Sequence, residues 1–115
     1  MEMKIRITKK IASEIFKMVV GTDKGMEKFQ RGIEDVWVIE LGIITITLRD
    51  ELKYDLFGNR VEGEHWIVYI YTIYGEDTHV YIDKQTLKID DFYTQEKLRE
   101  REESWKEEYK EATGK

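Results

Sequence analysis

The 115-residue sequence contains no cysteine, no proline and only two histidines. The absence of cysteine excludes a disulfide framework, a thiol nucleophile and a metal site built on thiolates. No segment approaches the roughly 18 consecutive apolar residues that a membrane-spanning helix needs, and the amino-terminal residues lack the apolar core of a signal peptide. We therefore expect a cytoplasmic protein that has no membrane partner.

Charged residues make up 37% of the chain and hydrophobic residues 41%, a balance typical of a folded domain. The charge is unevenly distributed: residues 34–91 carry a net charge of -8, against +4 for residues 1–33 and -1 for residues 92–115. Binding to nucleic acid depends on clustered basic residues, whereas an acidic surface attracts a basic protein. The distribution argues against direct nucleic-acid binding and favours a basic protein partner.

The length indicates one domain, which we place at residues 1–94, followed by a charged helix and tail at residues 95–115. The domain begins with Met3, Ile5 and Ile7, which alternate with charged residues. Alternation of this kind is typical of a strand with one buried face. We therefore expect a short strand at the amino terminus.

Two helices are expected after this strand. The first spans Lys9–Val20, with Thr8 as its N-cap and Gly21 as its end. The second is short and carries Met26 and Phe29. The first helix has an apolar stripe at helical spacing, which predicts that it packs on a sheet. This stripe contains Ile11, Ile15, Met18 and Val19, and it is broadened by Ala12, Phe16 and Val20.

The chain from Glu34 onward is rich in β-branched residues, which predicts strands. Gly42 divides two such runs, and we interpret it as a bend within one long strand. Leu52 to Phe57 is expected to form the next strand, with a turn at Gly58.

The strongest predicted hairpin joins residues 66–74 to residues 78–83 through a three-residue loop at residues 75–77. In that register Val68 lies opposite Lys84. One face would carry Trp66, Val68, Ile70, Val80 and Ile82, and the other Ile67, Tyr69, Tyr71, Ile73, His79, Tyr81 and Asp83.

The last predicted helix covers Gln95 to Ala112 and is almost entirely charged. Leu98, Trp105 and Tyr109 form one narrow apolar stripe on it. Either this stripe rests on the domain as a thin seam, or Trp105 and Tyr109 are contacts with a second subunit or another partner. The second interpretation predicts a homodimer.

Together these elements predict an α+β fold, in which an amino-terminal strand and helix pack on a curved antiparallel sheet of four to five strands, followed by the charged helix. Such an order is that of the cystatin-like arrangement. The core is expected to combine the helix stripe with one sheet face through Ile15, Phe16, Val19, Val68, Ile70 and Ile82.

The last hairpin also resembles known families. Residues 66–69, the turn at Gly75 and residues 79–89 are similar to the terminal hairpin of PepSY-like domains and of bacterial immunity proteins with a nuclear-transport-factor-like fold. Asp83, Thr86 and Ile89 match that pattern, while Leu87 stands where glycine is usual. Leu87 therefore predicts a different turn. The resemblance implies a small non-enzymatic domain that binds, inhibits or neutralises another protein.

The residues that could carry chemistry are few and poorly arranged in the sequence. His65 and His79 lie on neighbouring predicted strands with Asp83 or Glu64 nearby, but this spacing is not specific for a metal, and we expect exposed histidines. Ser13 and Ser104 do not sit in a context that activates a serine nucleophile. We therefore predict no catalytic residue, no metal and no cofactor.

Tyrosine is concentrated in the predicted hairpin, where four of the seven tyrosines fall within thirteen residues. Tyrosine suits recognition surfaces because its large ring has few rotatable bonds and its hydroxyl tolerates water. We therefore expect an acidic, tyrosine-bearing sheet face that captures a protein. Two alternatives stay open: the face is covered by the last helix or a second copy, or a pocket between helix and sheet binds a small ligand or acts as an enzyme site. The predicted partner-binding residues are Tyr69, Tyr71, His79, Tyr81 and Asp83.

Overall fold

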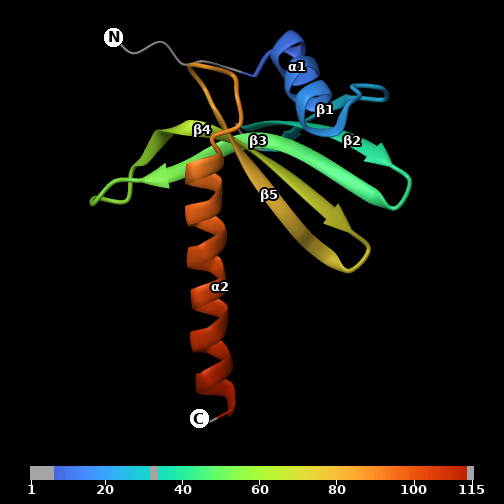
Figure 1. Cartoon of the computed structure of the whole chain (residues 1–115). Helices are drawn as coiled ribbons and strands as arrows, with labels where there is room; N and C mark the ends of the chain where they lie inside the picture. Colours follow the sequence, from blue (N-terminus) through green and yellow to red (C-terminus); the bar gives the residue numbers. More distant parts are fainter. Residues whose placement is uncertain (1–6, 32–33, 114–115) are drawn as a thin grey trace.

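The computed structural model describes residues 7–31 and 34–113, and these form an antiparallel five-stranded sheet with a helix near each end of the chain (Figure 1). Each strand pairs with the next along the chain, so β1 and β5 are the edges. The predicted α+β class is confirmed; Met3 and Ile5 of the predicted first strand lie outside the described residues. The elements are α1 Lys9–Val20, β1 Glu27–Arg31, β2 Glu34–Leu41, β3 Ile44–Tyr54, β4 Arg60–Thr72, β5 Gly75–Asp83 and α2 Asp91–Thr113.

Helix α1 begins and ends where the sequence predicts. The Thr8 hydroxyl accepts a hydrogen bond from the Ile11 N–H at 3.2 Å, so it satisfies a donor that the first turn leaves open. Gly21 has a φ of 82°, a left-handed conformation that glycine adopts without steric cost, and its N–H donates to the Lys17 carbonyl. Local capping chemistry therefore fixes both ends of α1.

The core lies between α1 and one face of the sheet. Ile15, Phe16 and Trp66 are at most 1% exposed, and the Trp37 indole N–H donates to the Ile7 carbonyl at 3.1 Å. Burial of the predicted core residues Ile15, Phe16, Val68 and Ile82 is confirmed, while Val19 and Ile70 pack on the core and stay partly exposed. The remaining core residues are Ile7, Ala12, Trp37, Ile39, Ile46 and Leu48.

The predicted short helix with Met26 and Phe29 is wrong, because Met26 lies just before β1 and Phe29 lies within it. Phe29 pairs with Val36 of β2, and its side chain is 52% exposed. A five-residue segment gains little from helical hydrogen bonds, whereas pairing with β2 satisfies its backbone groups along one side. Tertiary pairing has therefore overridden the local pattern.

The predicted bend at Gly42 is also wrong. Gly42 has a φ of 62° and lies in a tight turn between β2 and β3, which places Ile39 opposite Ile46. Gly supplies this left-handed conformation, which two-residue hairpin turns require. Two paired strands replace the single bent one.

The next predicted strand, Leu52 to Phe57, ends earlier than expected. Strand β3 continues through Leu52 to Tyr54, and the Asp55 carboxylate then accepts hydrogen bonds from the N–H groups of Phe57 and Asn59, both at 2.9 Å. An aspartate that binds backbone donors ahead of it closes a turn. Phe57 is consequently an exposed turn residue.

The register of the last hairpin differs from the predicted one. Val68 pairs with Val80 rather than with its predicted partner Lys84, and the turn lies at Ile73 and Tyr74 instead of residues 75–77. As far as Ile70 the shift is four residues, and an even shift leaves these side chains on their predicted faces because strand side chains alternate. The register is irregular between Ile70 and Tyr71, and Ile73 lies in the turn. The division of the hairpin into an apolar and a tyrosine-bearing face is therefore unaffected.

Helix α2 starts four residues before the predicted Gln95. The Asp90 carboxylate accepts a hydrogen bond from the Tyr93 N–H at 3.0 Å and caps the helix, while the Thr94 hydroxyl accepts from the Tyr81 N–H of β5. Figure 1 shows α2 leaving the sheet from this anchor and projecting beyond it. Neither α1 nor α2 is long and apolar enough to cross a membrane.

Candidate functional site

The sheet face opposite α1 carries a continuous series of ring contacts, which we call the aromatic face. It begins at Tyr93 of α2, which stacks on His65 at 4.1 Å between ring centroids and meets Tyr81 edge-on at 4.8 Å. Edge-to-face and offset contacts at these distances are the favoured geometries of aromatic rings. The aromatic face consists of His65, Tyr69, Tyr71, His79, Tyr81 and Tyr93.

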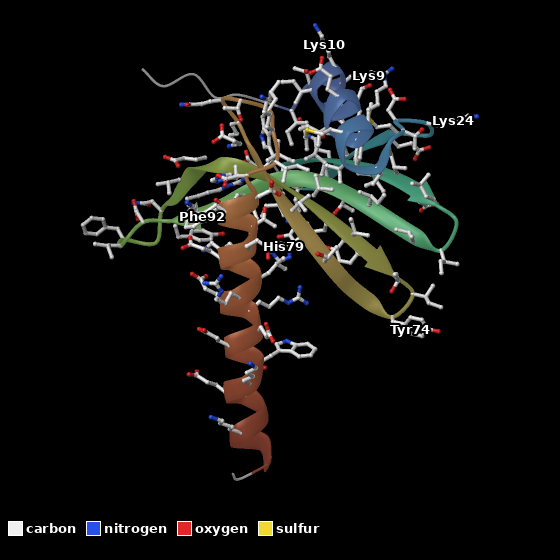
Figure 2. All side chains as sticks on the ribbon, viewed as in Figure 1. Lys9, Lys10, Lys24, Tyr74, His79 and Phe92 are labelled. Carbon is white, nitrogen blue, oxygen red and sulfur yellow. The ribbon has the colours of Figure 1, made fainter. Side chains whose placement is uncertain are left out.

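Burial divides this face into two parts. His65, His79 and Tyr81 are 5%, 6% and 8% exposed, so the expectation of exposed histidines is wrong. Tyr69 and Tyr71 are half-buried and stack on each other at 5.9 Å. In Figure 2, His79 lies on the side of the sheet where α2 runs, away from Lys9 and Lys10 of α1. The part that stays open to solvent is therefore the end with Tyr69 and Tyr71.

A small polar cluster lies where the sheet meets α2. The His65 Nε2 atom is 3.0 Å from the Asp90 carboxylate, and a ligand atom of Asp83 lies within 4.8 Å of a ligand atom of each. Two hydrogen bonds lower the pKa of Asp90, and the one from His65 has a larger effect than the one from the Tyr93 N–H. The sequence links His65 to Asp83 only without specificity, and it is the structure that brings Asp90 to them.

Asp83 is held by the turn that follows β5. Its Oδ1 atom accepts hydrogen bonds from the N–H groups of Gln85 at 2.8 Å and Thr86 at 3.0 Å. Leu87 then has a φ of 59°, so the expectation that leucine excludes a left-handed turn here is wrong. Its N–H donates to the Asp83 carbonyl, and its side chain packs on the core. Burial of the leucine side chain offsets a conformation that costs on the order of 1 kcal/mol.

A buried carboxylate, Glu51, supports the aromatic face from β3. The Tyr93 hydroxyl donates to it at 3.0 Å and Lys53 lies 3.4 Å away. Burial and the hydrogen bond to Glu51 raise the pKa of Tyr93, which stays protonated as a donor. A Cβ atom on Gly63 would lie 2.9 Å from the Glu51 carbonyl oxygen, so only glycine fits there. The sequence offered no signal for this arrangement, because Glu51, Gly63 and Tyr93 are far apart in the chain.

At the other end of the face, Arg49 connects β3 to β2 and β4. Its guanidinium group makes two hydrogen bonds to the Glu34 carboxylate, at 3.3 and 3.2 Å, and lies 5.9 Å from the Tyr69 ring. Two parallel hydrogen bonds fix the plane of the guanidinium group. Tyr69 is therefore supported by a positioned cation at one side and by His79, 5.7 Å away, at another.

The geometry does not assemble a serine nucleophile in the described part of the chain. The Ser13 hydroxyl donates to Asp23 near α1. Ser104 is exposed on α2, fourteen residues beyond Asp90, which corresponds to about 20 Å along a helix. The His65–Asp90 pair therefore has neither serine beside it.

Further large apolar side chains are exposed outside the aromatic face. Tyr74 at the β4–β5 turn is 90% exposed, and Trp105 on α2 is 68% exposed. Trp105 continues a line along α2 on which Leu98 and Arg101 are half-buried. The side chain of Tyr109, the second predicted oligomer contact, lies outside the described ones.

Ile15, Phe16 and Trp66 are buried together between α1 and the sheet, and the ligand-pocket alternative stays a prediction. No protein-family model, curated protein or solved structure matches this chain. The resemblance of the last hairpin to PepSY-like domains and immunity proteins therefore stays a prediction.

Proposed function

We propose that this protein is a non-catalytic module that binds another protein through the open end of the aromatic face, as an inhibitor or immunity-like protein does. Tyr69 and Tyr71 are the central contacts. The observation that carries this proposal is their half-buried, stacked arrangement on a sheet, with Tyr69 supported by Arg49 and His79. Tyrosines fixed in this way lose little conformational freedom when they bind, which favours affinity.

The buried residues of the predicted site have a different role in this proposal. His79 and Tyr81 contact neighbouring rings and position them, so they support the surface without forming it. Asp83 is half-buried at the far end of the face. The contact surface therefore shifts from the middle of β5 toward the β4–β5 turn, where Ile73 and Tyr74 are exposed.

The charge of residues 34–91 favours a basic partner. Their net charge is -8, and three of their five basic residues, Arg49, Lys53 and Lys84, are already paired with carboxylates of the same region. An acidic region accelerates encounter with a basic surface, and the effect weakens as salt screens it. Raising the salt concentration should therefore slow association more than it accelerates dissociation.

The test uses a photo-crosslinking residue in place of Tyr71 and, as a matched control, in place of Tyr54, which is 64% exposed at the β3–β4 turn. The partner crosslinked at position 71 is then purified and its affinity measured for the Tyr69→Ala/Tyr71→Ala protein and for Tyr54→Ala. We expect the double variant to lose on the order of 2 kcal/mol of binding free energy and the control to lose little. Unchanged affinity of a folded double variant would place the site elsewhere, and turnover of a substrate would overturn the non-catalytic assignment.

A homodimer through α2 is a second candidate, favoured by the exposure of Trp105. Trp105 lies on the same side of α2 as the half-buried Leu98 and Arg101, but it is itself 68% exposed. It therefore leaves a large apolar area uncovered. Light scattering of the full chain at high concentration tests this candidate. We expect a dimer that Trp105→Ala converts to a monomer, and a monomeric full-length protein would exclude it.

A further inference from the structure

We propose that His65, Asp83 and Asp90 form a binding site for a divalent first-row transition-metal ion such as Zn²⁺. Each residue offers one ligand atom, and these atoms lie within 4.8 Å of one another. The three residues come from β4, from the end of β5 and from the residue before α2. A bound ion would therefore tie the start of α2 to two strands.

The spacing of His65 and Asp90 suits such an ion, and the Asp83 ligand atom lies within 4.8 Å of both. Two ligands at about 2.0–2.2 Å from one metal lie roughly 2.8–3.6 Å apart at octahedral or tetrahedral angles. His65 Nε2 and the Asp90 Oδ2 atom are 3.0 Å apart, so an ion can bind both with little movement. One imidazole nitrogen with two carboxylates favours a transition metal, because Mg²⁺ and Ca²⁺ prefer oxygen ligands alone.

The positions of the ligands are fixed by other contacts. The His65 ring stacks on Tyr93 with an interplanar angle of 4° and meets Tyr81 at 89°. Its Nδ1 atom is buried without a hydrogen-bond partner among the described residues, so packing sets the direction of the ring. Nε2 is the ring nitrogen that faces Asp90, so it is the atom that would bind the ion, and Nδ1 would carry the proton.

Charge also favours a cation at this position. In the described part of the chain, neither Asp83 nor Asp90 forms an ion pair with lysine or arginine, and nearby Lys84 is bound to Asp50 at 2.7 Å. The Oδ1 atoms of both aspartates accept hydrogen bonds from backbone N–H groups. Their Oδ2 atoms are not used by these backbone hydrogen bonds. Two carboxylates without a lysine or arginine partner attract a divalent ion.

The chain provides a matched control, because its only other histidine, His79, is also buried on the aromatic face and also meets Tyr81 edge-on. Zn²⁺ is titrated into metal-free protein by calorimetry, and Co²⁺ is added separately to record its ligand-field absorption. We expect one ion per chain and a melting temperature several degrees higher when Zn²⁺ is in excess of its Kd. His79→Gln should bind like the unchanged protein, whereas His65→Gln should lose at least tenfold in affinity.

Asp83→Asn and Asp90→Asn extend the test without removing the turn and cap, because an asparagine oxygen still accepts the backbone N–H groups. Each should weaken Zn²⁺ binding at least tenfold while the apo protein stays folded. These variants carry the test if His65→Gln fails to fold. The proposal is overturned if Zn²⁺ does not bind at one ion per chain, or if His79→Gln and the aspartate variants affect binding equally. None of these outcomes depends on the proposed partner surface.

Discussion

The two faces of the sheet are built from different chemistry. The face under α1 is mainly apolar, with Ile39, Leu48, Trp66 and Val68 fully buried and the Lys84–Asp50 ion pair beside Trp66. The aromatic face buries Glu51, His65 and His79 as well, and its residues are linked by hydrogen bonds and ring contacts. Helix α1 lies across the first face, whereas α2 touches the second near its start and then leaves it (Figure 1).

The difference follows from how completely each face is covered. A helix with a broad apolar stripe excludes water from one face, so that face is stabilised mainly by the burial of apolar side chains. Partial cover leaves the other face in contact with water, and amphipathic rings with ion pairs then satisfy both environments. A face of this second kind presents specific polar groups, which is why the candidate site lies there.

The comparison predicts the largest loss of stability on the α1 side. Replacing Ile15, which is 1% exposed, by aspartate buries a carboxylate without a partner and should reduce the free energy of unfolding by about 2–5 kcal/mol. The same substitution at Met18, 41% exposed on the same helix, should have a small effect. Urea denaturation measures both, and equal losses would show that the α1 stripe does not face the core.

A smaller but specific effect is expected at Gly63. A methyl group there would meet the Glu51 carbonyl oxygen at 2.9 Å, and backbone atoms cannot move away without disturbing the strand pair. Gly63→Ala should therefore cost about 1–3 kcal/mol, as overpacking does. Thermal unfolding measures the loss, and an unchanged melting temperature would contradict the close approach of β3 and β4.

Removal of one hydroxyl tests the polar support of the aromatic face. Tyr93→Phe takes away the donor to Glu51 and should cost about 1 kcal/mol, because Lys53 still compensates the carboxylate. Tyr54→Phe is the control, since Tyr54 is 64% exposed. If both variants unfold at the same urea concentration as the parent, the Glu51–Tyr93 contact does not stabilise the protein.

The smallest effect is expected at Asp23, near α1. The Ser13 hydroxyl, helped by Lys17, lowers the pKa of Asp23 below its ordinary value of 3.8. A lowered pKa stabilises the folded protein above the ordinary value, and this stabilisation is lost as the pH falls through the lowered one. Ser13→Ala should raise the pKa of Asp23 in an NMR titration, whereas Ser104→Ala, on α2, should leave it unchanged. An unshifted pKa in Ser13→Ala would assign the effect to other groups.

The features that the sequence determined are those governed by local rules. Thr8 and Gly21 define α1 because capping depends on neighbouring residues, and alternation assigns side chains of the last hairpin to their faces even when the register shifts by four. The tyrosine-rich face could be predicted for the same reason. Local rules failed at Met26 and Phe29, where pairing with β2 outweighs the weak preference of a short segment.

The tertiary structure alone decided which polar residues meet. Asp90 contacts His65 although the two are 25 residues apart in the sequence, and Tyr93 contacts Glu51 although they are 42 residues apart. Both contacts arise because the start of α2 packs onto β5 and the edge of the aromatic face. The same fold buries His79, which no local pattern indicated. Contacts between residues distant in the chain depend on strand pairing and on the packing of α2, and neither property is encoded in the residues next to them.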